Sequence, residues 1–503
     1  MSIFDNIVAS FSPETAYRRE AYRQAYEALK SNYDAGSYDK ANRNWRVSNS
    51  SAELTDRYSR DDVRARARDL ERNSDIMNSV VGAYKRNVVG GGYHVEVRTE
   101  DEELNKQIEK AWKRWCKKQN CDVTGTQSLN QIIRMAVERK KIDGGILFVK
   151  KYTRDGFVPF KLQMIEVDEL DTGTVQPKKQ GNKVVGGIEY DPCNKPVGYF
   201  IRQYDIDGYS QRDPVFVDAK DVIFFFTKKR PSQLREMSDM APTIPRIRDV
   251  NEFITAVSVK ERIEACLSIF IKKTIPTLGV GRSGTPPASD RVSYDGKKLT
   301  PGMIKELNVG DEIQVVNPSG QGADATSFTK LQQRLVGAGQ GISYEATSRD
   351  MAESTYSSAR QGLIEDDLTY KEDRELLIEV LDEIYETFVI SAVLCGALSI
   401  PKFWIEKERY LSHEWIQEPK PWIDPYKESN ANMIALKTGQ KTYKQIAAEN
   451  GRDWRAQVDD MAEVLNYGKE KGIDMGGVLF GIKENSPEPD DEGSGGKPAE
   501  KEE

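Results

Sequence analysis

A strongly periodic apolar pattern lies in the second half of the chain. Apolar residues recur there at helical spacing, and these are Leu377, Val380, Leu381, Ile384 and Phe388. Steps of three and four residues place them on one face of a helix, so the pattern predicts a long amphipathic helix with one buried face. We expect that helix to begin near residue 357.

A second helical pattern begins near residue 328 and runs into three closely spaced glycines, Gly337, Gly339 and Gly341. Each glycine in a helix interior costs about 1 kcal/mol relative to alanine. We therefore expect the helix to end or bend at these glycines. The residues that follow, 344–357, are mostly polar and small. From the pattern alone, this region is a helical hairpin with a solvated loop.

The longest uninterrupted helical pattern follows Pro245 and extends to about residue 273. One flank is apolar and carries Val250, Phe253, Ile254 and Val257. Another flank is mainly charged and carries Arg248, Glu252, Thr255 and Arg262. At about 1.5 Å per residue, a helix of about 26 residues is about 39 Å long. The pattern thus predicts a helix longer than most in globular proteins.

Residues 61–241 mix helical and strand-like patterns. The helical patterns cover residues 61–89, 103–118 and 128–141, the last with Ser128 as a candidate N-cap. Turn signals separate the strand-like runs that follow, at Asp155-Gly156, Asp191-Pro192 and Asp207-Gly208. Short strands joined by such turns favour a mostly antiparallel sheet beside helices. The sequence therefore predicts the α+β fold class.

Two segments near the start of the chain are rich in arginine. Arg64, Arg68 and Arg72 lie on one helix face, but acidic residues stand among them. We therefore expect intrahelical ion pairs and a solvated face rather than a phosphate-binding stripe. Residues 13–45 alternate tyrosines with cations. That pattern suits either contact with nucleic acid or an arm that packs on a neighbouring subunit.

The composition is that of a soluble protein, with 38% hydrophobic and 30% charged residues. No stretch reaches the roughly 18 apolar residues that a membrane-spanning helix needs, so we expect no membrane partner. The N-terminus also lacks the basic and apolar regions of a secretion signal. The five cysteines include no CxxC pair, which favours a reduced cytoplasm.

The formal net charge is −7, but it is unevenly distributed. Residues 484–503 carry eight acidic residues against two lysines, so the rest of the chain is close to neutral. A protein that grips nucleic acid tightly usually has a clear basic excess. The acidic end is also rich in proline and glycine and poor in apolar residues, which predicts disorder there.

A search for catalytic residues finds no recognisable arrangement. The two histidines, His94 and His413, stand outside any GxSxG, HExxH or HxH context. Gly90-Gly91-Gly92 lacks the flanking residues of a nucleotide-binding loop. The acidic run Glu365-Asp366-Asp367 is typical of a solvated helix face. We therefore predict a protein that is not an enzyme, with no cofactor and no metal site.

Four segments, in order along the chain, resemble the lambda-type family of bacteriophage portal proteins. The most specific is ISYEATSRDMAESTYSSAR at residues 342–360, and the others lie at residues 64–92, 299–313 and 422–442. The resemblance covers roughly residues 20–480. One motif departs from the family pattern R-P-G-Q-x-R-G, because Ser232 and Glu236 replace its two glycines. Because of this departure, the family pattern does not predict the conformation of the local turn.

The resemblance implies a ring oligomer with an α/β wing, a long-helix stem, a small β-containing clip and a helical C-terminal crown region. In chain order it implies an N-terminal arm (1–60), the wing (61–241), a first stem helix (242–273), the clip (274–326), a second stem helix (327–343), a channel or tunnel loop (344–357), a long wing helix with following strands and loops (358–424), the crown (425–483) and a disordered acidic tail (484–503).

The function implied by the resemblance is a ring at one capsid vertex through which double-stranded DNA is packaged and ejected. The implied partners are DNA without sequence specificity, the terminase large subunit, capsid and scaffold proteins, neck or head-completion proteins, and further copies of the chain in a dodecamer. The implied location is the portal vertex of the virion, reached from the host cytoplasm during assembly.

The residues that would face DNA follow from the same resemblance. In the channel loop they are Ser348, Arg349, Asp350, Glu353, Ser354, Thr355 and Tyr356. In the stem they are Arg248, Glu252, Thr255 and Arg262. DNA carries about one charge per 1.7 Å of axis, so a basic lining repeated around a ring would hold it. The near-neutral charge of the chain outside residues 484–503 suits free passage of DNA through such a ring.

Two alternatives from other classes remain open on sequence alone. One is a metal-dependent nuclease or other DNA-processing enzyme that uses acidic helices. The other is a monomeric adaptor whose helical hairpin binds a partner helix.

Overall fold

The computed structural model describes residues 12–30, 49–265, 269–273, 311–315, 322–352, 354–417 and 425–473. These residues belong to two compact units. The first comprises Met1–Ser59 and Lys229–Leu234, and the second comprises Arg60–Lys228 and Arg235–Glu503. The acidic tail expected at 484–503 lies outside the described residues.

The first unit contains helices α2 (Pro13–Lys30) and α3 (Ala52–Asp56). Tyr17 and Tyr22 on α2 are each 76% exposed. The Ala52 N–H donates to Ser232 Oγ at 2.9 Å, and an Arg230 guanidinium nitrogen donates to the Ser50 carbonyl oxygen at 2.9 Å. Segment 229–234, which we expected to belong with residues 61–241, therefore clusters with the N-terminal residues. Ser232, one of the two residues that replace motif glycines, makes one of these contacts.

The second unit begins with a series of helices. They are α4 (Arg60–Asn73), α5 (Asp75–Tyr84), the π-helical turn η2 (Lys85–Val89), α6 (Glu102–Trp115), α7 (Lys118–Cys121) and α8 (Leu129–Asp143). Ser74 separates α4 from α5, and its Oγ accepts the Met77 N–H at 3.3 Å. Ser128 is the N-cap of α8, as predicted, and its N–H donates to Gln131 Oε1 at 2.9 Å.

All named strands of this unit pair in antiparallel fashion. One sheet has the order β3-β2-β8, with β2 at Gly145–Tyr152, β3 at Phe160–Ile165 and β8 at Val222–Phe226. The other has the order β4-β5-β6-β7, with β4 at Lys183–Val185, β5 at Ile188–Tyr190, β6 at Pro196–Ile201 and β7 at Val215–Asp218. The short 3-10 turns η3 (Val167–Glu169) and η4 (Ala219–Asp221) lie between strands. The predicted α+β class and antiparallel pairing are confirmed.

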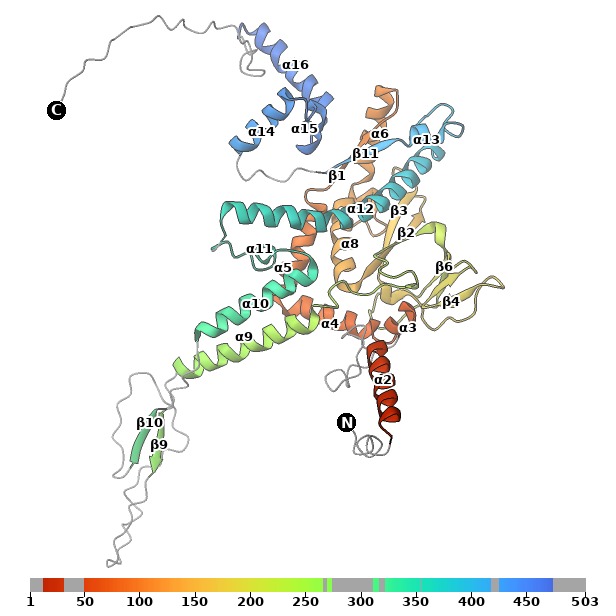
Figure 1. Ribbon diagram of the computed structural model, residues 1–503. Helices are drawn as coiled ribbons and strands as arrows, with labels where there is room; N and C mark the ends of the chain where they lie inside the picture. Colours follow the sequence, from red (N-terminus) through yellow and green to blue (C-terminus); the bar gives the residue numbers. More distant parts are fainter. Residues whose placement is uncertain are drawn as a thin grey trace, which may run out of the picture. The chain divides into compact units, whose positions relative to one another are not determined.

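The core of the second unit forms around α12 (Tyr356–Leu394), a helix of 39 residues (Figure 1). Phe388 lies 5.2 Å from Trp112 and 5.4 Å from Trp115, measured between ring centroids. Trp115 stacks on Phe160 of β3 at 5.2 Å and donates its indole N–H to the Phe160 carbonyl oxygen at 2.8 Å. The side chains of Trp115, Tyr385 and Phe388 are fully buried. The apolar face predicted from spacing is thus the buried face.

Strand pairing also joins distant parts of the second unit. Strand β1 (Tyr93–Val97) pairs with β11 (His413–Gln417), which follows the short helix α13 (Lys407–Tyr410). Residues from both of the segments expected as wing, 61–241 and 358–424, therefore share one hydrophobic core.

Two long helices, α9 (Ile244–Ala265) and α10 (Gly322–Gln340), pack side by side, with the Phe253 and Phe328 rings 4.5 Å apart (Figure 1). Strand β9 (Ile269–Lys273) pairs with β10 (Asp311–Val315). The expected helix over 242–273 is therefore wrong at its end, because residues 269–273 form a strand. The second helix, expected over 327–343, begins earlier and ends earlier. Residues 274–310 and 316–321 lie outside the described residues.

Residues 425–473 are helical, as the sequence predicts. They form α14 (Pro425–Lys437), α15 (Tyr443–Glu449) and α16 (Trp454–Glu470). Thr442 caps α15 by accepting the Gln445 N–H at 3.2 Å. Within the described ranges, no helix combines the length and apolar character needed to cross a membrane.

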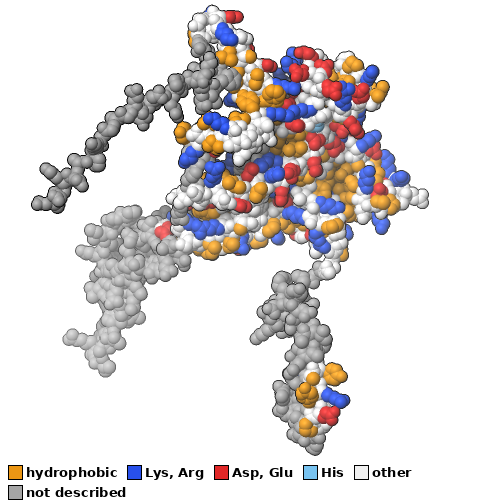
Figure 2. All heavy atoms as spheres, turned by 45° about the horizontal axis from the view of Figure 1, so that its top comes forward, with side chains coloured by type: hydrophobic (Ala, Val, Ile, Leu, Met, Phe, Trp, Pro, Cys, Tyr) orange, Lys and Arg blue, Asp and Glu red, His pale blue; other side chains and the backbone are white. Residues whose placement is uncertain are grey.

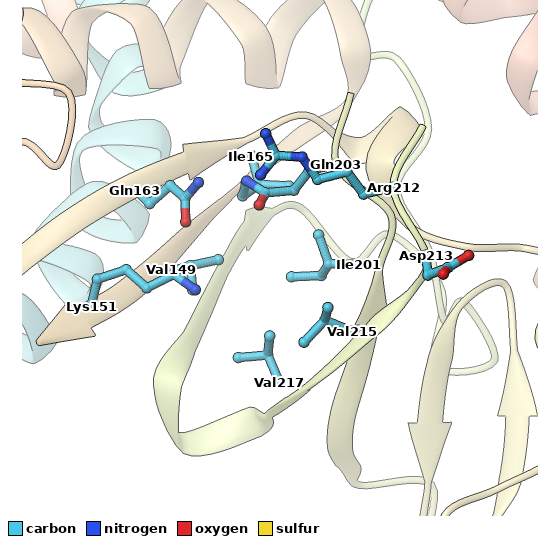
Figure 3. A pocket seen from close by; sticks show the side chains of 10 residues that line it. All are labelled: Val149, Lys151, Gln163, Ile165, Ile201, Gln203, Arg212, Asp213, Val215 and Val217. Atoms are coloured by element: carbon cyan, nitrogen blue, oxygen red, sulfur yellow. The ribbon is translucent and has the colours of Figure 1, made fainter. Parts of the chain in front are cut away.

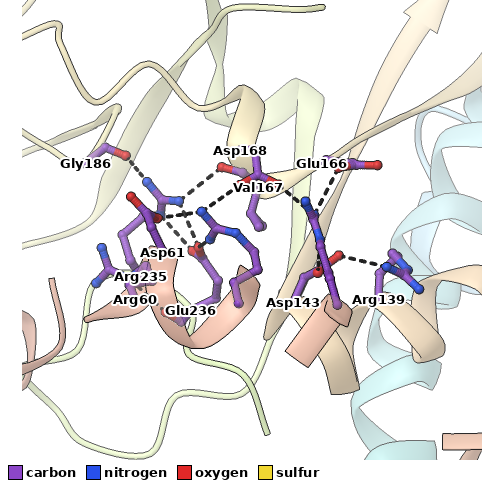
Figure 4. A network of polar contacts seen from close by, with 12 residues as sticks. Arg60, Asp61, Arg139, Asp143, Glu166, Val167, Asp168, Gly186, Arg235 and Glu236 are labelled. Atoms are coloured by element: carbon purple, nitrogen blue, oxygen red, sulfur yellow. Dashed lines mark hydrogen bonds and ion pairs between the residues drawn. The ribbon is translucent and has the colours of Figure 1, made fainter. Parts of the chain in front are cut away.

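The motif that departs from the family pattern forms a buried ion network (Figure 4). Glu236 is fully buried, and its carboxylate accepts from Arg235 Nε at 2.7 Å and from Arg64 Nη1 at 3.2 Å. Arg64 also pairs with Asp61 at 2.5 Å and with Asp168 at 2.7 Å. Burial disfavours the Glu236 carboxylate, but the surrounding guanidinium groups outweigh it and lower the pKa of Glu236. The solvated face expected around Arg64 is therefore wrong, since this arginine is buried.

Candidate functional site

The segment from α10 to α12 is built around close backbone approaches. A Cβ on Gly337 would lie 2.7 Å from the Ile342 carbonyl oxygen and 2.9 Å from Thr347 Oγ1, so only glycine fits there. Gly341 has φ +71°, a left-handed conformation that ends α10. The prediction that the glycines end the helix holds at Gly341. At Gly337 and Gly339 it is wrong, because both remain helical.

A short helix occupies part of the expected loop. α11 (Tyr344–Ser348) is capped by Ser343, whose Oγ accepts the Ala346 N–H at 3.2 Å. Arg349 has φ +59° and ends α11. The loop expected over 344–357 is therefore wrong at both ends, because residues 344–348 belong to α11 and α12 already begins at Tyr356.

The base of this segment is fixed to α12 by hydrogen bonds. The Asp366 carboxylate accepts the Ser343 N–H at 2.6 Å and the Ser343 hydroxyl at 2.7 Å. Thr369 Oγ1 donates to the Gly341 carbonyl oxygen at 2.6 Å. Asp366, which we expected on a solvated face, is only 3% exposed.

Several of the predicted loop residues hold the loop in shape. Asp350 accepts the Ala352 N–H at 3.0 Å and the Tyr344 hydroxyl at 3.3 Å, and these bonds lower the pKa of Asp350. Ser348 Oγ donates to the Tyr344 carbonyl oxygen at 2.9 Å. Ser354 Oγ donates to Glu345 Oε1 at 3.0 Å.

The remaining predicted loop residues are Arg349, Glu353, Thr355 and Tyr356. Thr355 is the N-cap of α12 and accepts the Ser358 N–H at 3.3 Å. Arg349 is exposed. Tyr356 is the first residue of α12, and Glu353 lies outside the described residues. Ser348, Arg349, Asp350, Ser354 and Thr355 thus lie between the last residue of α11 and the N-cap of α12.

The predicted stem residues share one exposed face of α9. Arg248 Nε donates to Glu252 Oε1 at 2.7 Å, and this bond raises the pKa of Arg248. Thr255 Oγ1 donates to the Asn251 carbonyl oxygen at 2.8 Å, and Arg262 Nε donates to the Ser258 carbonyl oxygen at 3.4 Å. The Arg248–Glu252 pair leaves this part of the face without net charge.

A buried cluster of charges joins α8, which carries Lys140 and Lys141, to Asp373 of α12. Lys140 Nζ lies 2.7 Å from Asp373 Oδ1 and 3.0 Å from Asp239 Oδ2, and Lys141 Nζ lies 2.8 Å from Asp373 Oδ2. Burial opposes ionisation of Asp373, but Lys141 and Lys140 outweigh it and lower its pKa. The nearby Tyr84 hydroxyl donates to the carbonyl oxygen of Gln340, the last residue of α10. Sequence reasoning missed this cluster, because lysines in a helix are usually solvated.

Of the two histidines, one is exposed and the other contacts a carboxylate. His94 is exposed in β1. His413 contacts the Asp382 carboxylate at 3.0 Å and the Leu411 carbonyl oxygen at 2.7 Å. Burial disfavours the Asp382 carboxylate, but the hydrogen bonds from His413 and Trp415 outweigh it and lower its pKa. Across the described part of the chain, no group of His, Cys, Asp and Glu side chains is arranged to hold a metal ion.

One small pocket of 160 Å³ lies between the two sheets (Figure 3). Its aliphatic residues are Val149, Ile165, Ile201, Val215 and Val217. Lys151, Gln163, Gln203, Arg212 and Asp213 complete the lining. Neither histidine lines this pocket.

Comparison with known proteins gives the family. Residues 38–374 match the family described as phage portal protein, lambda family. The chain belongs to the lambda family of phage portal proteins. The match spans most of the sequence, including α9, α10 and the turn between α10 and α12.

Relatives of this portal protein carry the same description. The probable portal protein of Halomonas phage phiHAP-1 is 25% identical over 431 residues, covering 82% of this chain and 81% of the relative. Portal protein B of Escherichia phage lambda is 18% identical, covering 78% of this chain and 81% of the relative. The resemblance noted in the sequence is confirmed, and the chain has the role of a phage portal protein.

Solved structures are also similar to this portal protein. The neck of an empty GTA particle has a TM-score of 0.43 and 12% identity, and the match covers 77% of this chain and 93% of that chain. An HK97 family phage portal protein from Corynebacterium diphtheriae has a TM-score of 0.28 and 9% identity, with coverage of 57% and 80%. Because the portal family is structural rather than enzymatic, the family supports the prediction of a non-enzyme over the nuclease alternative.

Proposed function

We propose that copies of this portal protein form a ring at one capsid vertex and that double-stranded DNA enters and leaves the capsid through its channel. The observation that carries the proposal is the exposed face of α9. On this face Arg248 and Glu252 neutralise each other and Thr255 is uncharged, so that of these four residues Arg262 alone contributes a net charge. DNA carries about one negative charge per 1.7 Å, so a lining with little net positive charge lets it slide.

The turn between α10 and α12 is the second part of the proposed channel. We assign DNA-facing roles to Ser348, Arg349, Asp350, Glu353, Ser354, Thr355 and Tyr356. The hydrogen bonds of Ser348, Asp350 and Ser354 support this assignment, because they keep the turn in one shape while DNA moves past it. Acidic Asp350 offsets the charge of exposed Arg349, so the turn also adds little net charge.

The surface of the chain suits a conduit better than a tight DNA-binding protein. On the face seen in Figure 2, basic and acidic side chains are interspersed over the described residues. Interspersed charges give a weak net field, whereas tight binding to DNA uses concentrated basic patches.

The other regions have proposed roles in assembly. We assign residues 61–241 and 358–424 to the wing, α9 and α10 to the stem, the part of the expected clip (274–326) that precedes α10 to the clip, and residues 425–483 to the crown. The clip would dock the terminase large subunit during packaging and neck or head-completion proteins afterwards. Capsid and scaffold proteins would contact the wing. Energy for packaging would come from terminase, since the sequence has no nucleotide-binding motif.

Electron microscopy of the purified full chain tests the proposal. Rings with a central hole, in a dodecamer, are the expected result. Sedimentation that gives only monomers at micromolar concentration, in both low and high salt, would contradict it. Metal-dependent cleavage of DNA by those monomers would favour the nuclease alternative.

A further inference from the structure

Two arginines are exposed where α11 packs against α5 (Figure 1). Arg86 belongs to η2, the π-helical turn that directly follows α5, and Arg349 ends α11. Because α11 lies against α5, the two guanidinium groups are close enough for the charge of Arg349 to act on Arg86. The two positions are far apart in the sequence, so the fold alone brings these cations together.

Neither arginine has a counter-ion within the described part of the chain. Partial burial and the positive charge of Arg349 lower the pKa of Arg86, and among the described residues no carboxylate opposes them. The neighbouring Arg374 differs, because it pairs with Asp367 at 2.9 Å. Two like charges without a counter-ion repel each other, so an anion from outside the single chain would stabilise this pair.

Unusual backbone features set the positions of both arginines. Arg349 has φ +59°, a left-handed conformation that residues other than glycine rarely adopt. Arg86 folds back over α5, because its Nη1 lies 3.0 Å from the position that a Cβ on Gly82 would take. It also belongs to a π-helical turn, and such turns occur frequently at functional sites. The backbone thus places the two cations together despite their repulsion.

We infer that Arg86 and Arg349 together bind a backbone phosphate of double-stranded DNA. The inference rests on the proposed function, which puts Arg349 against DNA, and it adds Arg86 to that surface. A guanidinium group presents its N–H donors in a planar fork that matches phosphate oxygens. A DNA phosphate carries one negative charge and two unesterified oxygens, so each arginine binds one oxygen and the repulsion between the arginines is offset.

The site is compatible with the passage of DNA. Asp350 and Glu353, in the same segment as Arg349, balance the two arginines in formal charge. The Asp350 carboxylate accepts from the Tyr344 hydroxyl at 3.3 Å and from the Ala352 N–H at 3.0 Å, so it has hydrogen-bond donors of its own. Each copy therefore offers DNA one point of contact without making the channel lining strongly basic.

Arginine-specific labelling of rings of the full chain tests the site directly. Phenylglyoxal modifies accessible arginines, and mass spectrometry gives the extent of modification at each position. A mixed-sequence DNA duplex should slow the modification of Arg86 and Arg349 about fivefold. Arg154, which is exposed between β2 and β3, is the matched control and should react equally with and without DNA. Inorganic phosphate at the same phosphate concentration should protect much less, because it lacks the many simultaneous contacts that hold DNA in a ring.

Each other outcome of the labelling overturns a stated claim. Rings in which DNA leaves both arginines fully reactive would overturn the inference while leaving the proposed function standing. Loss of reactivity on assembly without DNA would show that a neighbouring copy supplies the anion, and equal protection by inorganic phosphate would show a site for free anions; either result overturns the inference. If the unaltered chain forms no rings, the proposed function itself fails, and the two failures are thus distinguished.

Binding of a DNA duplex to variant rings provides an independent test. Arg86→Gln combined with Arg349→Gln should weaken binding about tenfold at low salt and make the affinity less dependent on salt, because phosphate contacts are lost. Arg86→Lys keeps the charge and should keep the salt dependence, although it loses the planar fork. Arg154→Gln removes the same charge elsewhere and should change neither quantity. Unchanged affinity and salt dependence in intact rings of the double variant would contradict the site.

Discussion

The second half of α12 and the pair α9–α10 have equally clear apolar patterns but different surroundings. Phe388 and Val389 of α12 are fully buried within the chain, whereas Ile254 and Val259 of α9 are 42% and 40% exposed. Periodicity therefore predicts which face of a helix is apolar, but not whether the same chain covers that face. In the proposed ring, other copies would cover the exposed apolar residues of α9.

Charged residues differ between the same two regions. Around the core, Glu236 and Lys140 belong to buried networks in which every charge has a counter-ion. On α9, the Arg248–Glu252 pair is exposed, and exposed pairs contribute at most about 1 kcal/mol. We therefore expect the core to be sensitive to the loss of one charge, whereas α9 should tolerate such a change within the single chain.

The largest effect should follow Phe388→Ala, because the side chain is fully buried against Trp112 and Trp115. We expect a loss of about 3–5 kcal/mol in the free energy of unfolding, measured with urea. Ile254→Ala on α9 is the matched control and should cost less than about 1 kcal/mol in unassembled chains. Equal losses of unfolding free energy in the two variants would contradict the claim that the chain itself covers the apolar face of α12 but not that of α9.

Glu236→Gln should cost about 3 kcal/mol, because it leaves Arg235 and Arg64 without their buried counter-ion. The pKa of Glu236 is lowered below 4.5, so its stabilising effect is present above pH 4.5 and is lost as the pH falls through the folded-state value. Urea unfolding at several pH values should give a weaker acid dependence for the variant. A variant with the same acid profile as the unaltered chain would show that Glu236 is not the group responsible.

Asp350→Lys combined with Glu353→Lys should leave rings intact but slow DNA packaging in vitro. Each copy would add two cations to the proposed channel, and the resulting attraction should weaken as salt rises. Glu408→Lys with a second exposed change, Glu379→Lys, adds the same charge elsewhere. Normal packaging by intact double-mutant rings would exclude the channel role of this turn but not the portal role.

The smallest effect should follow removal of residues 486–503. That segment is acidic and almost free of apolar residues, so it cannot contribute to a packed core. Ring yield and melting temperature should not change. A large fall in ring yield would show that the tail takes part in assembly.

Much of the fold could be predicted because it is encoded locally. The start of α12, the cap at Ser128 and the antiparallel pairing follow from apolar spacing, capping chemistry and turn residues. The pairing of β1 with β11 joins residues more than 300 positions apart. No local signal gives such a partner.

The candidate site was harder to predict for two physical reasons. α11 is only five residues long, and its polar sequence resembles a loop, so its cap at Ser343 was not recognised. Arg64 and Asp366 were expected to be solvated, and Lys140 was not singled out, yet each is buried with an opposite charge or a hydrogen-bond partner from a distant segment. Burial of a charge depends on its partner, and the sequence does not say where the partner lies.

Hydroxyl-radical footprinting of the full chain, below and above its assembly concentration, tests the central claim most directly. The account predicts that Ile254 and Val259 of α9 lose reactivity on assembly, while the buried Phe388 stays unreactive in both states. Unchanged reactivity of both α9 residues in fully formed rings would contradict the claim that neighbouring copies cover this surface.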